Sequence, residues 1–421
     1  MPELESRLAP ATVPATPAAP AGTLGTASPD GVRTSAAAPA PQARSADASR
    51  LTPAQRLKRL AAKAVGREVY SSARSVYKLA RWGQERHEPF SLRHKAYAWS
   101  HGFLSFSTAL YDLPRNDPRE YVNDFTRLFR ASRINPAPQF LDHKFLLRSV
   151  LLGKGFPQPE TVALVYRSDI LIHPFDGSNR YLSPADLDRW LIEDGGAFIV
   201  KPQDGRCGRD VFLVEVRDGA LVRRRGKDAR PFQFAGRVRN DILLVERRVE
   251  QGAFWRTLYP ESSNTIRALT MWVPGDEAPF LAAAAQRIGT ADTMPTDNFS
   301  GGGIAAPIDL ATGRLGTGSR HPVKARGMGA QQRGITHHPD TGVPIEGAVL
   351  PHWERLRDSV LRAAASLPTN RYVGWDIIVD DTGAPVIIEG NARPGLDVVQ
   401  THRGLLADPE ARRFYEKCGV L

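Results

Sequence analysis

The spacing of apolar residues along the chain changes near residue 140. Before that position, apolar residues recur at helical intervals among many Lys and Arg side chains. Thr52-Pro53-Ala54-Gln55 offers an N-cap, a proline at the first helical position and a capping glutamine, which predicts a long basic helix from Thr52 to about Trp82. Another helix is predicted to start at Asp117 and to lead into Phe129, so residues 51–139 are expected to form a basic helical segment. Its aromatic residues are expected to face a core or an interface: Trp82, Phe90, Trp99, Phe103, Phe106, Tyr121, Phe125 and Phe129.

After residue 140 the chain consists of short apolar runs rich in strand formers. Asp142 is predicted to cap a helix that ends near Leu152, and Ser183-Pro184-Ala185-Asp186 is predicted to open another. Many strands with few connecting helices predict an α+β body over residues 140–410, not a doubly wound parallel sheet, with residues 411–421 as a C-terminal tail. The predicted strands are Glu160–Tyr166, Ala197–Lys201, Val211–Val216, Asp241–Val249, Thr265–Val273 and Leu281–Arg287, before a glycine-rich stretch from Gly301 to Gly334 and a final hairpin.

The N-terminal part of the chain has an unusual composition and charge. Residues 1–50 contain 14 Ala and 8 Pro and no aromatic residue, so they cannot bury enough surface to offset chain entropy, and we expect a disordered tail. The net charge of +11 is concentrated in residues 51–133, where 16 Lys and Arg accompany 7 Asp and Glu. Because the rest is nearly neutral, we expect no nucleic-acid partner. A peripheral membrane contact through residues 51–133 remains an alternative to a docked helix with a solvated face.

The two cysteines, Cys207 and Cys418, offer neither a zinc-ligand spacing nor a disulfide framework, which fits a reducing interior. No apolar run approaches the roughly 18 residues of a membrane span, and the start of the chain lacks the features of a signal peptide. We therefore expect a cytoplasmic protein. No feature of the sequence addresses its oligomeric state.

Acidic residues and an asparagine alternate with apolar residues in the final hairpin. Apolar runs flank Asp381-Thr382-Gly383, which predicts a turn that pairs Asp376 with Glu389. Asn391 then shares the face of Glu389, because strand side chains alternate. Two facing carboxylates repel unless a cation lies between them, and oxygen ligands select a hard ion such as Mg²⁺. The alternative is a scaffold hairpin with Asp376 in solvent.

A lysine ends the predicted strand Ala197–Lys201, directly before the glycine-bearing polar loop Gln203–Arg209. A lysine at this place can bind phosphate as a point charge, and glycines allow backbone N–H groups to approach the phosphate oxygens. The Gly-Lys-Ser/Thr order of a P-loop is missing. The alternative is that Lys201 is a solvated strand end.

These two clusters, in this order, resemble the ATP-grasp superfamily. Further motifs narrow the resemblance to the sugar-transfer-associated ATP-grasp family, which is related to α-L-glutamate ligases. The resemblance covers roughly residues 140–405, although Arg206-Cys207-Gly208-Arg209 departs from the usual Gly-Gly-Lys-Gly form of the loop. The motifs are Ser263-Asn264-Thr265-Ile266-Arg267, Gln286-Arg287-Ile288-Gly289, Asp297-Asn298-Phe299-Ser300-Gly301-Gly302-Gly303, and Glu389-Gly390-Asn391 followed by Arg393-Pro394-Gly395.

The resemblance implies an ATP-grasp fold, in which two α+β subdomains grip ATP. Asp376, Glu389 and Asn391 are similar to the ligands of two Mg²⁺ ions, for which Mn²⁺ is an alternative. The candidates for neutralising charge during catalysis are Arg267, Arg287 and Arg393.

The resemblance also implies where ATP binds. Lys144 and Lys201 look like phosphate-binding lysines, and the loop with Gly205 and Gly208 looks like a flexible lid. Val245–Val249 resembles the strand whose backbone contacts adenine. The remaining candidates are Glu246 and Val249 on that strand, Glu250 for the ribose hydroxyls and Asn298 for substrate or phosphate.

The activity implied by the resemblance is that of an ADP-forming ligase. Such an enzyme converts a small-molecule carboxylate to an acylphosphate, which an amine or a hydroxyl then attacks. The family name suggests a saccharide acceptor and modification of the cell surface. A small-molecule kinase of the same fold and a non-catalytic nucleotide-binding or membrane-edge protein are the alternatives.

Overall fold

The computed structural model describes residues 73, 76–77, 79–80, 90–204, 210–225, 228–234, 242–327, 329 and 332–421. The described residues all lie within residues 58–421, which form one compact unit, and residues 1–57 lie outside the described residues. The predicted tail and most of the predicted helix from Thr52 to Trp82 therefore lie outside the described residues, although residues 73, 76, 77, 79 and 80 are helical. None of the helices in the described part of the chain combines the length and the hydrophobicity that a membrane crossing requires.

Residues 90–139 of the N-terminal segment, which the structure describes without a gap, form short helices. The prediction of one helix leading from Asp117 into Phe129 is wrong. Asp117 accepts a hydrogen bond from the backbone N–H of Arg119 and caps a single 3-10 turn, after which the chain is extended at Tyr121. Asn123 caps the next helix separately. The elements are α3 (Leu92–Ser100), α4 (Ser105–Leu110), a 3-10 helix (Pro118–Glu120), α5 (Asp124–Phe129) and a second 3-10 helix (Ala131–Arg133).

Two helices lead from this segment into the first sheet. Asp142, which was predicted to cap the second of them, is instead the last residue of α6 (Gln139–Asp142). The chain is extended at His143, whose imidazole accepts a hydrogen bond from the backbone N–H of Leu146 and so caps α7 (Lys144–Gly153). This break places Asp142 and Lys144 on either side of the α6–α7 junction.

The first sheet has eight strands in the order β3-β2-β1-β8-β4-β5-β6-β7, with antiparallel pairing throughout. Helix α8 (Pro184–Asp194), capped by Ser183 as predicted, buries Leu187 and Leu191 against it. The strands are β1 (Thr161–Tyr166), β2 (Asp169–Ile172), β3 (Arg180–Leu182), β4 (Ala197–Pro202), β5 (Phe212–Arg217), β6 (Ala220–Arg225), β7 (Asp228–Pro231) and β8 (Leu243–Arg247).

The second sheet has six antiparallel strands in the order β12-β11-β10-β9-β13-β14. Its strands are β9 (Ile266–Met271), β10 (Phe280–Ile288), β11 (Ile304–Pro307), β12 (Ser319–Arg320), β13 (Tyr372–Val379) and β14 (Pro385–Asn391). The helices around it are α9 (Ala253–Leu258), α10 (Pro322–Gly327), α11 (Trp353–Ala365) and α12 (Pro409–Lys417), with 3-10 turns at Phe299–Gly301 and Leu405–Ala407. The α+β class and the predicted strands are confirmed.

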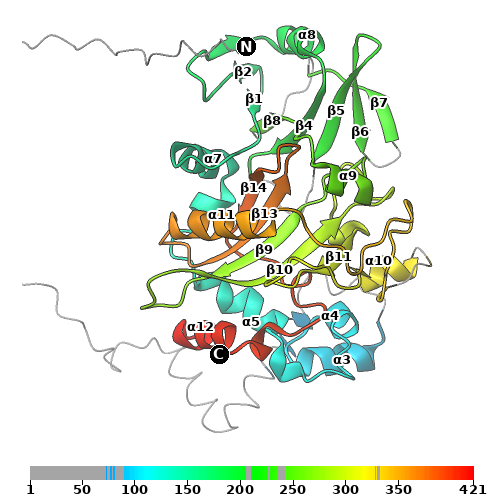
Figure 1. Ribbon diagram of the computed structural model, residues 1–421, viewed down its shortest axis with the longest axis vertical. Helices are drawn as coiled ribbons and strands as arrows, with labels where there is room; N and C mark the ends of the chain where they lie inside the picture. The colour runs from blue at the N-terminus through cyan, green and yellow to red at the C-terminus, as the bar shows by residue number, and fades with distance from the viewer. Residues whose placement is uncertain are drawn as a thin grey trace, which may run out of the picture. The chain divides into compact units, whose positions relative to one another are not determined.

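The two faces of the six-stranded sheet pack against different hydrophobic cores. Successive residues of a strand point to opposite faces, so neighbouring residues can belong to different cores. Ala268 packs in a core with α9 and α11, whereas Leu269 and Tyr372 pack in a second core with α12 on the other face (Figure 1). Arg267 is two residues from Leu269 on β9, and Asp376 is four residues from Tyr372 on β13. Both charged residues therefore lie on the face of Leu269 and Tyr372. This face is thus apolar at one end and charged at the other.

Both ends of the described chain take part in this second face. Residues 411–421, predicted as a tail, contain most of α12, whose Phe414 and Tyr415 are fully buried beside Tyr372. The N-terminal Phe103 and Tyr121 are buried together with Phe299 and Val398 from the loops that follow β10 and β14. The expectation that N-terminal aromatic residues face a core is confirmed for this cluster.

Candidate active site

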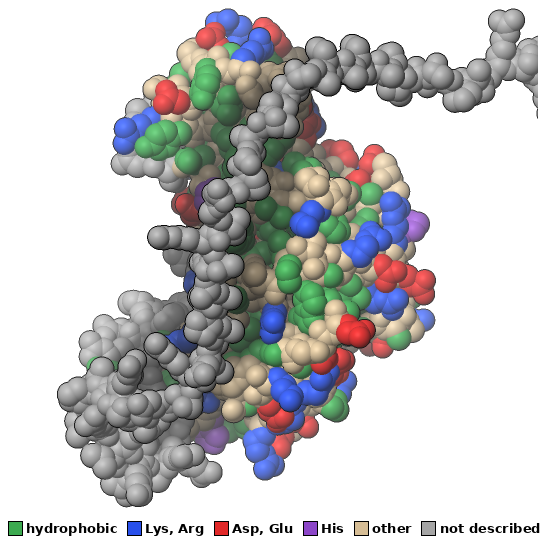
Figure 2. Space-filling view, turned by 90° about the vertical axis from the view of Figure 1, so that its left-hand side faces the viewer, with side chains coloured by type: hydrophobic (Ala, Val, Ile, Leu, Met, Phe, Trp, Pro, Cys, Tyr) green, Lys and Arg blue, Asp and Glu red, His purple; other side chains and the backbone are tan. Residues whose placement is uncertain are grey.

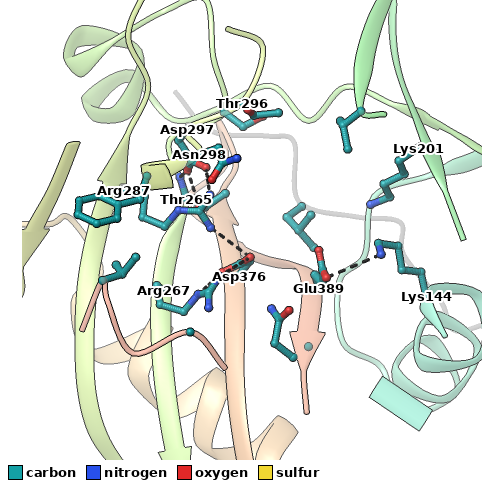
Figure 3. A pocket seen from close by; sticks show the side chains of 18 of the residues that line it. Lys144, Lys201, Thr265, Arg267, Arg287, Thr296, Asp297, Asn298, Asp376 and Glu389 are labelled. Carbon is teal, nitrogen blue, oxygen red and sulfur yellow. Dashed lines mark hydrogen bonds and ion pairs between the residues drawn. The ribbon is translucent and has the colours of Figure 1, made fainter. Parts of the chain in front are cut away.

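Residues from both sheets and from the α6–α7 junction line a cavity of about 290 Å³ (Figure 3). Its walls come from β4 and β8 of the eight-stranded sheet, from β9, β10, β13 and β14 of the six-stranded sheet, and from the loops at residues 295–300 and 391–398. The volume is near the lower end of the range of small-molecule sites, which is about 300–1,000 Å³. The cavity is lined by ten of the fourteen site residues that the sequence predicts.

The hairpin has the predicted register where its polar residues lie. Asp376 pairs with Glu389, and Gly374 pairs with Asn391, so the two carboxylates and the amide occupy adjacent strands. A bulge after Asp376 shifts the register by one residue toward the turn. The bulge is confined to the apolar part of the hairpin and does not separate the polar residues.

Asp376 is held by two arginines. Its Oδ1 accepts a hydrogen bond from Arg267 Nε at 2.6 Å, and its Oδ2 accepts from Arg267 Nη2 at 3.1 Å and from Arg287 Nη1 at 3.2 Å (Figure 3). Burial opposes ionisation of this carboxyl, but Arg267 and Arg287 outweigh burial and hold the pKa of Asp376 below its ordinary value. The carboxylate is therefore charged at neutral pH.

Arg287 also pairs with a second carboxylate, that of Asp297. The backbone N–H of Thr265 donates to Asp297 Oδ2 at 2.6 Å, and the Thr265 hydroxyl donates to the same oxygen (Figure 3). Burial nevertheless raises the pKa of Asp297 above its ordinary value, against the opposing effect of Arg287. Arg287 thus bridges two buried acids at the cavity wall.

Lys201 reaches a buried carboxylate on the neighbouring strand. Its Nζ lies 2.8 Å from Glu246 Oε2, and Arg148 Nη1 lies 2.7 Å from Glu246 Oε1. Desolvation lowers the pKa of Lys201, and Glu246 opposes this effect. Burial raises the pKa of Glu246, but Arg148 and Lys201 reverse this and leave it below its ordinary value. Glu246 therefore orients a cation within the cavity.

The α6–α7 junction contributes one carboxylate, Asp142, and one cation, Lys144, to the cavity. Lys144 Nζ lies 3.7 Å from Glu389 Oε1, and Arg393 Nη1 lies 3.5 Å from Asp142 Oδ2. Lys144 is buried, whereas the Arg393 side chain is 43 % exposed. The break between α6 and α7 thus joins the N-terminal segment to β14 and the loop after it.

Of the other predicted site residues, two line the cavity, two do not, and two lie outside the described residues. Asn298 and Asn391 line the cavity, and the Asn391 amide donates to the backbone oxygen of Gly374. Among the described residues, neither Val249 nor Glu250 lines this cavity. The predicted lid residues Gly205 and Gly208 lie outside the described residues.

The donor set agrees with a hard metal ion that also binds phosphate. Asp376, Glu389 and Asn391 offer two carboxylates and an amide at one wall of the cavity. Within residues 90–204, 210–225, 228–234, 242–327 and 332–421, no three His, Cys, Asp or Glu side chains form a metal cage. Mg²⁺ usually takes one or two carboxylates and completes its shell with water and phosphates, so these residues fit it.

A family comparison decides the classification. The profile of the sugar-transfer associated ATP-grasp family matches residues 125–413. The chain belongs to this family. The match confirms the resemblance inferred from the motifs and the ATP-grasp fold, and it begins earlier than residue 140, so that it includes α5 of this ATP-grasp chain. No curated protein matches the chain.

Solved ATP-grasp structures show distant likeness. N5-carboxyaminoimidazole ribonucleotide synthetase from Thermotoga maritima has 10 % identity and a TM-score of 0.33 over 62 % of this chain and 45 % of its own. L-amino acid ligase from Bacillus licheniformis has 14 % identity and a TM-score of 0.31 over 62 % and 42 %. D-alanyl-alanine synthetase A from Vibrio cholerae has 9 % identity and a TM-score of 0.38 over 66 % and 65 %. The chain spans less than half the length of the first two, and these likenesses do not bear on its substrate.

Arg148 and Asp297 are two of the charged residues at the site that sequence reasoning missed. Arg148 lies one helical turn after Lys144 in α7, a spacing that places both on one side of the helix. Asp297 begins the motif that supplied Asn298, but its pairing with Arg287 depends on how the loop folds back onto β10. The first residue had a weak signal in the sequence, and the second had none beyond the motif.

Proposed function

We propose that this chain is an ATP- and Mg²⁺-dependent, ADP-forming ligase that joins a small-molecule carboxylate to an amine or a hydroxyl. One observation carries the proposal. Among the described residues, five Lys and Arg side chains line one cavity together with the side-chain oxygens of Asp376, Glu389 and Asn391. Such an arrangement is suited to charge that develops on transferred phosphoryl oxygens.

The proposed reaction has two steps. A carboxylate oxygen of the substrate first bonds to the γ-phosphorus of ATP, the bond from that phosphorus to the β–γ bridging oxygen breaks, and ADP leaves. The acceptor nitrogen or oxygen then bonds to the carbonyl carbon of the acylphosphate and the carbon–oxygen bond to phosphate breaks. A neutral acceptor loses one proton in this step, whereas an acceptor that binds as an ammonium loses one proton before the attack and a second as the amide forms. Both steps build negative charge on oxygen, which fixed cations stabilise.

The residues of the chain divide this work. Lys144 and Lys201 lie on the side formed by α7 and β4 and would neutralise phosphate oxygens. Asp376, Glu389 and Asn391 would hold Mg²⁺, which when bound supplies a Lewis acid at the phosphates. The candidates for the charge on the transferred group and the oxyanion are Arg267, Arg287 and Arg393.

Some finer assignments remain proposals from the sequence. Val249 and Glu250 are assigned to adenine and ribose, and Gly205 and Gly208 to a lid. The saccharide acceptor rests on the family description alone. A membrane contact through residues 51–133 is a separate prediction.

The test is an ADP-release screen of the purified full chain with amino acids and sugar acids, with and without hydroxylamine. A ligase is expected to release ADP in proportion to the carboxylate and to give a hydroxamate with hydroxylamine. A phosphorylated product without hydroxamate would indicate a kinase. ATP binding without any ADP release across the screen would leave a nucleotide-binding protein and overturn the proposal.

A further inference from the structure

The charged side chains that line the cavity form ion pairs, with one exception among the described residues. The described lining residues include six carboxylates and five Lys or Arg side chains. Each of the five cations lies between 2.5 and 3.7 Å from a different carboxylate, and the sixth carboxylate, Asp397, forms no side-chain hydrogen bond or ion pair with any described residue. The pairs are Lys144–Glu389, Lys201–Glu246, Arg267–Asp376, Arg287–Asp297 and Arg393–Asp142.

The backbone around Asp397 fixes the position of this carboxylate. A Cβ at Gly395 would lie 2.7 Å from Asp397 Oδ1, so the carboxylate rests against the Gly395 backbone and a side chain there would displace it. The Thr401 hydroxyl donates to the backbone oxygen of Asp397. The fully buried Gln400 amide accepts from the N–H of Val122 at 3.3 Å and donates to the oxygen of Val122 at 3.0 Å. The N-terminal segment thus holds the loop that carries Asp397.

The titratable groups that interact electrostatically with Asp397 are engaged elsewhere or uncharged. Arg287 faces it electrostatically but is bound to Asp297 and Asp376, and Arg127 is paired with Asp124. His321 also faces it, but this imidazole is buried between Phe106 and Phe299, and burial lowers its pKa. Tyr111, on the N-terminal side, is a neutral phenol at pH 7. No described neighbour therefore neutralises Asp397.

We infer that Asp397 binds the ammonium group of the acceptor, and that the acceptor is therefore a primary amine and not a neutral hydroxyl compound. An unpaired carboxylate in a partly desolvated cavity is costly, and a ligand cation offsets that cost. The inference rests on the proposed function. Asp397 lies in the loop after β14, whose last residues include Glu389 and Asn391, so the assigned ammonium site adjoins the proposed phosphate-transfer residues.

The test compares acceptors in wild type, Asp397→Asn and a matched surface control, Asp381→Asn. The carboxylate is the best one from the ADP-release screen, and the acceptor probes are glucosamine, N-acetylglucosamine and a mixture of L-amino acids, each against hydroxylamine, which is uncharged at neutral pH. Products are read by mass spectrometry as amide, ester or hydroxamate. We expect wild type to form an amide, and we expect the ratio of amide to hydroxamate to fall at least tenfold in Asp397→Asn but not in Asp381→Asn.

The possible outcomes separate the two proposals. Ester formation by wild type, or an unchanged ratio in Asp397→Asn, overturns the ammonium site but leaves the ligase. A proportional loss of amide and hydroxamate with a raised Mg²⁺ requirement also overturns it, because Asp397 would then serve the metal. If wild type forms neither ADP nor hydroxamate, the ligase proposal falls, and this inference falls with it.

A second measurement, the melting temperature Tm, tests whether the Asp397 carboxylate is unpaired and needs no activity assay. Asp397→Asn removes a carboxylate with no partner, so we expect its Tm to equal or exceed that of wild type. Asp376→Asn removes a carboxylate that accepts from Arg267 and Arg287, so we expect its Tm to fall by at least about 2 °C. Equal losses of Tm in both variants would mean that Asp397 is paired within the protein and would overturn the inference.

Discussion

Asp376 and Glu389 lie directly opposite each other on β13 and β14, yet each carboxylate faces a different cation. Asp376 is bound by Arg267 and Arg287, whereas Glu389 lies near Lys144. Separate cations on the two sides of the cavity thus offset the repulsion that the two facing carboxylates would otherwise cause (Figure 3). Because Asp376 binds two arginines and Glu389 lies near one lysine, we expect substitutions of the two acids to have different effects.

Glu389→Gln should lower turnover at least about tenfold, a barrier change of about 1.4 kcal/mol. The substitution keeps the size of the side chain but removes the charge that would bind Mg²⁺. Initial rates of ADP release across a Mg²⁺ titration provide the measurement. Because the Glu389 side chain is 25 % exposed and 3.7 Å from its cation, we expect little loss of stability. Wild-type rates at limiting Mg²⁺ would contradict the metal assignment.

Asp376→Asn should destabilise the protein by about 1–3 kcal/mol at pH 7, because two buried guanidinium groups lose a charged acceptor. The pKa of Asp376 is lower in the folded protein than its ordinary value of 3.8, so its stabilisation is complete above that value and is lost as pH falls through the folded pKa. Urea unfolding of both proteins from pH 7 to pH 2.5 provides the measurement. The difference should be constant near neutrality and should narrow below about pH 4. If the difference in the free energy of unfolding increased in acid, it would contradict stabilisation of the Asp376 carboxylate by the two arginines.

Lys201→Ala should weaken ATP binding and turnover together, because a phosphate-binding cation contributes in the ground state and in the transition state. Calorimetric titration with a non-hydrolysable ATP analogue, beside ADP-release rates, provides the measurement. Lys154→Ala, which removes an exposed lysine at the end of α7, is the matched control. Undiminished analogue binding by Lys201→Ala would mean that the pair with Glu246 is purely structural.

Two truncations should behave differently. Removing residues 1–50 should leave Tm and turnover almost unchanged, since their composition predicts no core contact. Removing residues 1–133 should give insoluble or ligand-poor protein, because Phe103 and Tyr121 are buried with Phe299 and Val398, at roughly 1.5–3 kcal/mol for a buried Phe. It would also remove Val122, which holds Gln400.

Expression yield, thermal melting and ATP-analogue binding of both truncations provide the measurement. A body starting at residue 134 that melts cooperatively and binds ATP normally would show that the N-terminal segment is a separate module. Its net charge of +9 would then favour a polyanionic or membrane partner.

The basic residues of the described surface are scattered and not gathered into one patch in the view of Figure 2, where Lys and Arg alternate with Asp and Glu. This mixture agrees with the near-neutral composition of residues 134–421. The charge asymmetry noted in the sequence therefore concerns the N-terminal segment.

Several features were predictable from the sequence because they depend on neighbouring residues. Strand alternation and the turn at Asp381-Thr382-Gly383 determine the hairpin register, and with it the pairing of Asp376 with Glu389. Ser183 caps α8 through its own local contacts. The predictions at Asp117 and Asp142 failed at equally local sites, because the chain becomes extended within a few residues of each.

The ion pairs of the site were decided by the tertiary structure. Arg267 and Asp376 are 109 positions apart in the sequence, and Val122 and Gln400 are 278 apart, so no local pattern specifies their contact. Two sheets and the N-terminal segment have to pack before each carboxylate acquires its partner. The sequence by itself therefore determined which residues could carry the chemistry. Packing decided which charges are neutralised by a neighbour, and that Asp397 has no such neighbour among the described residues.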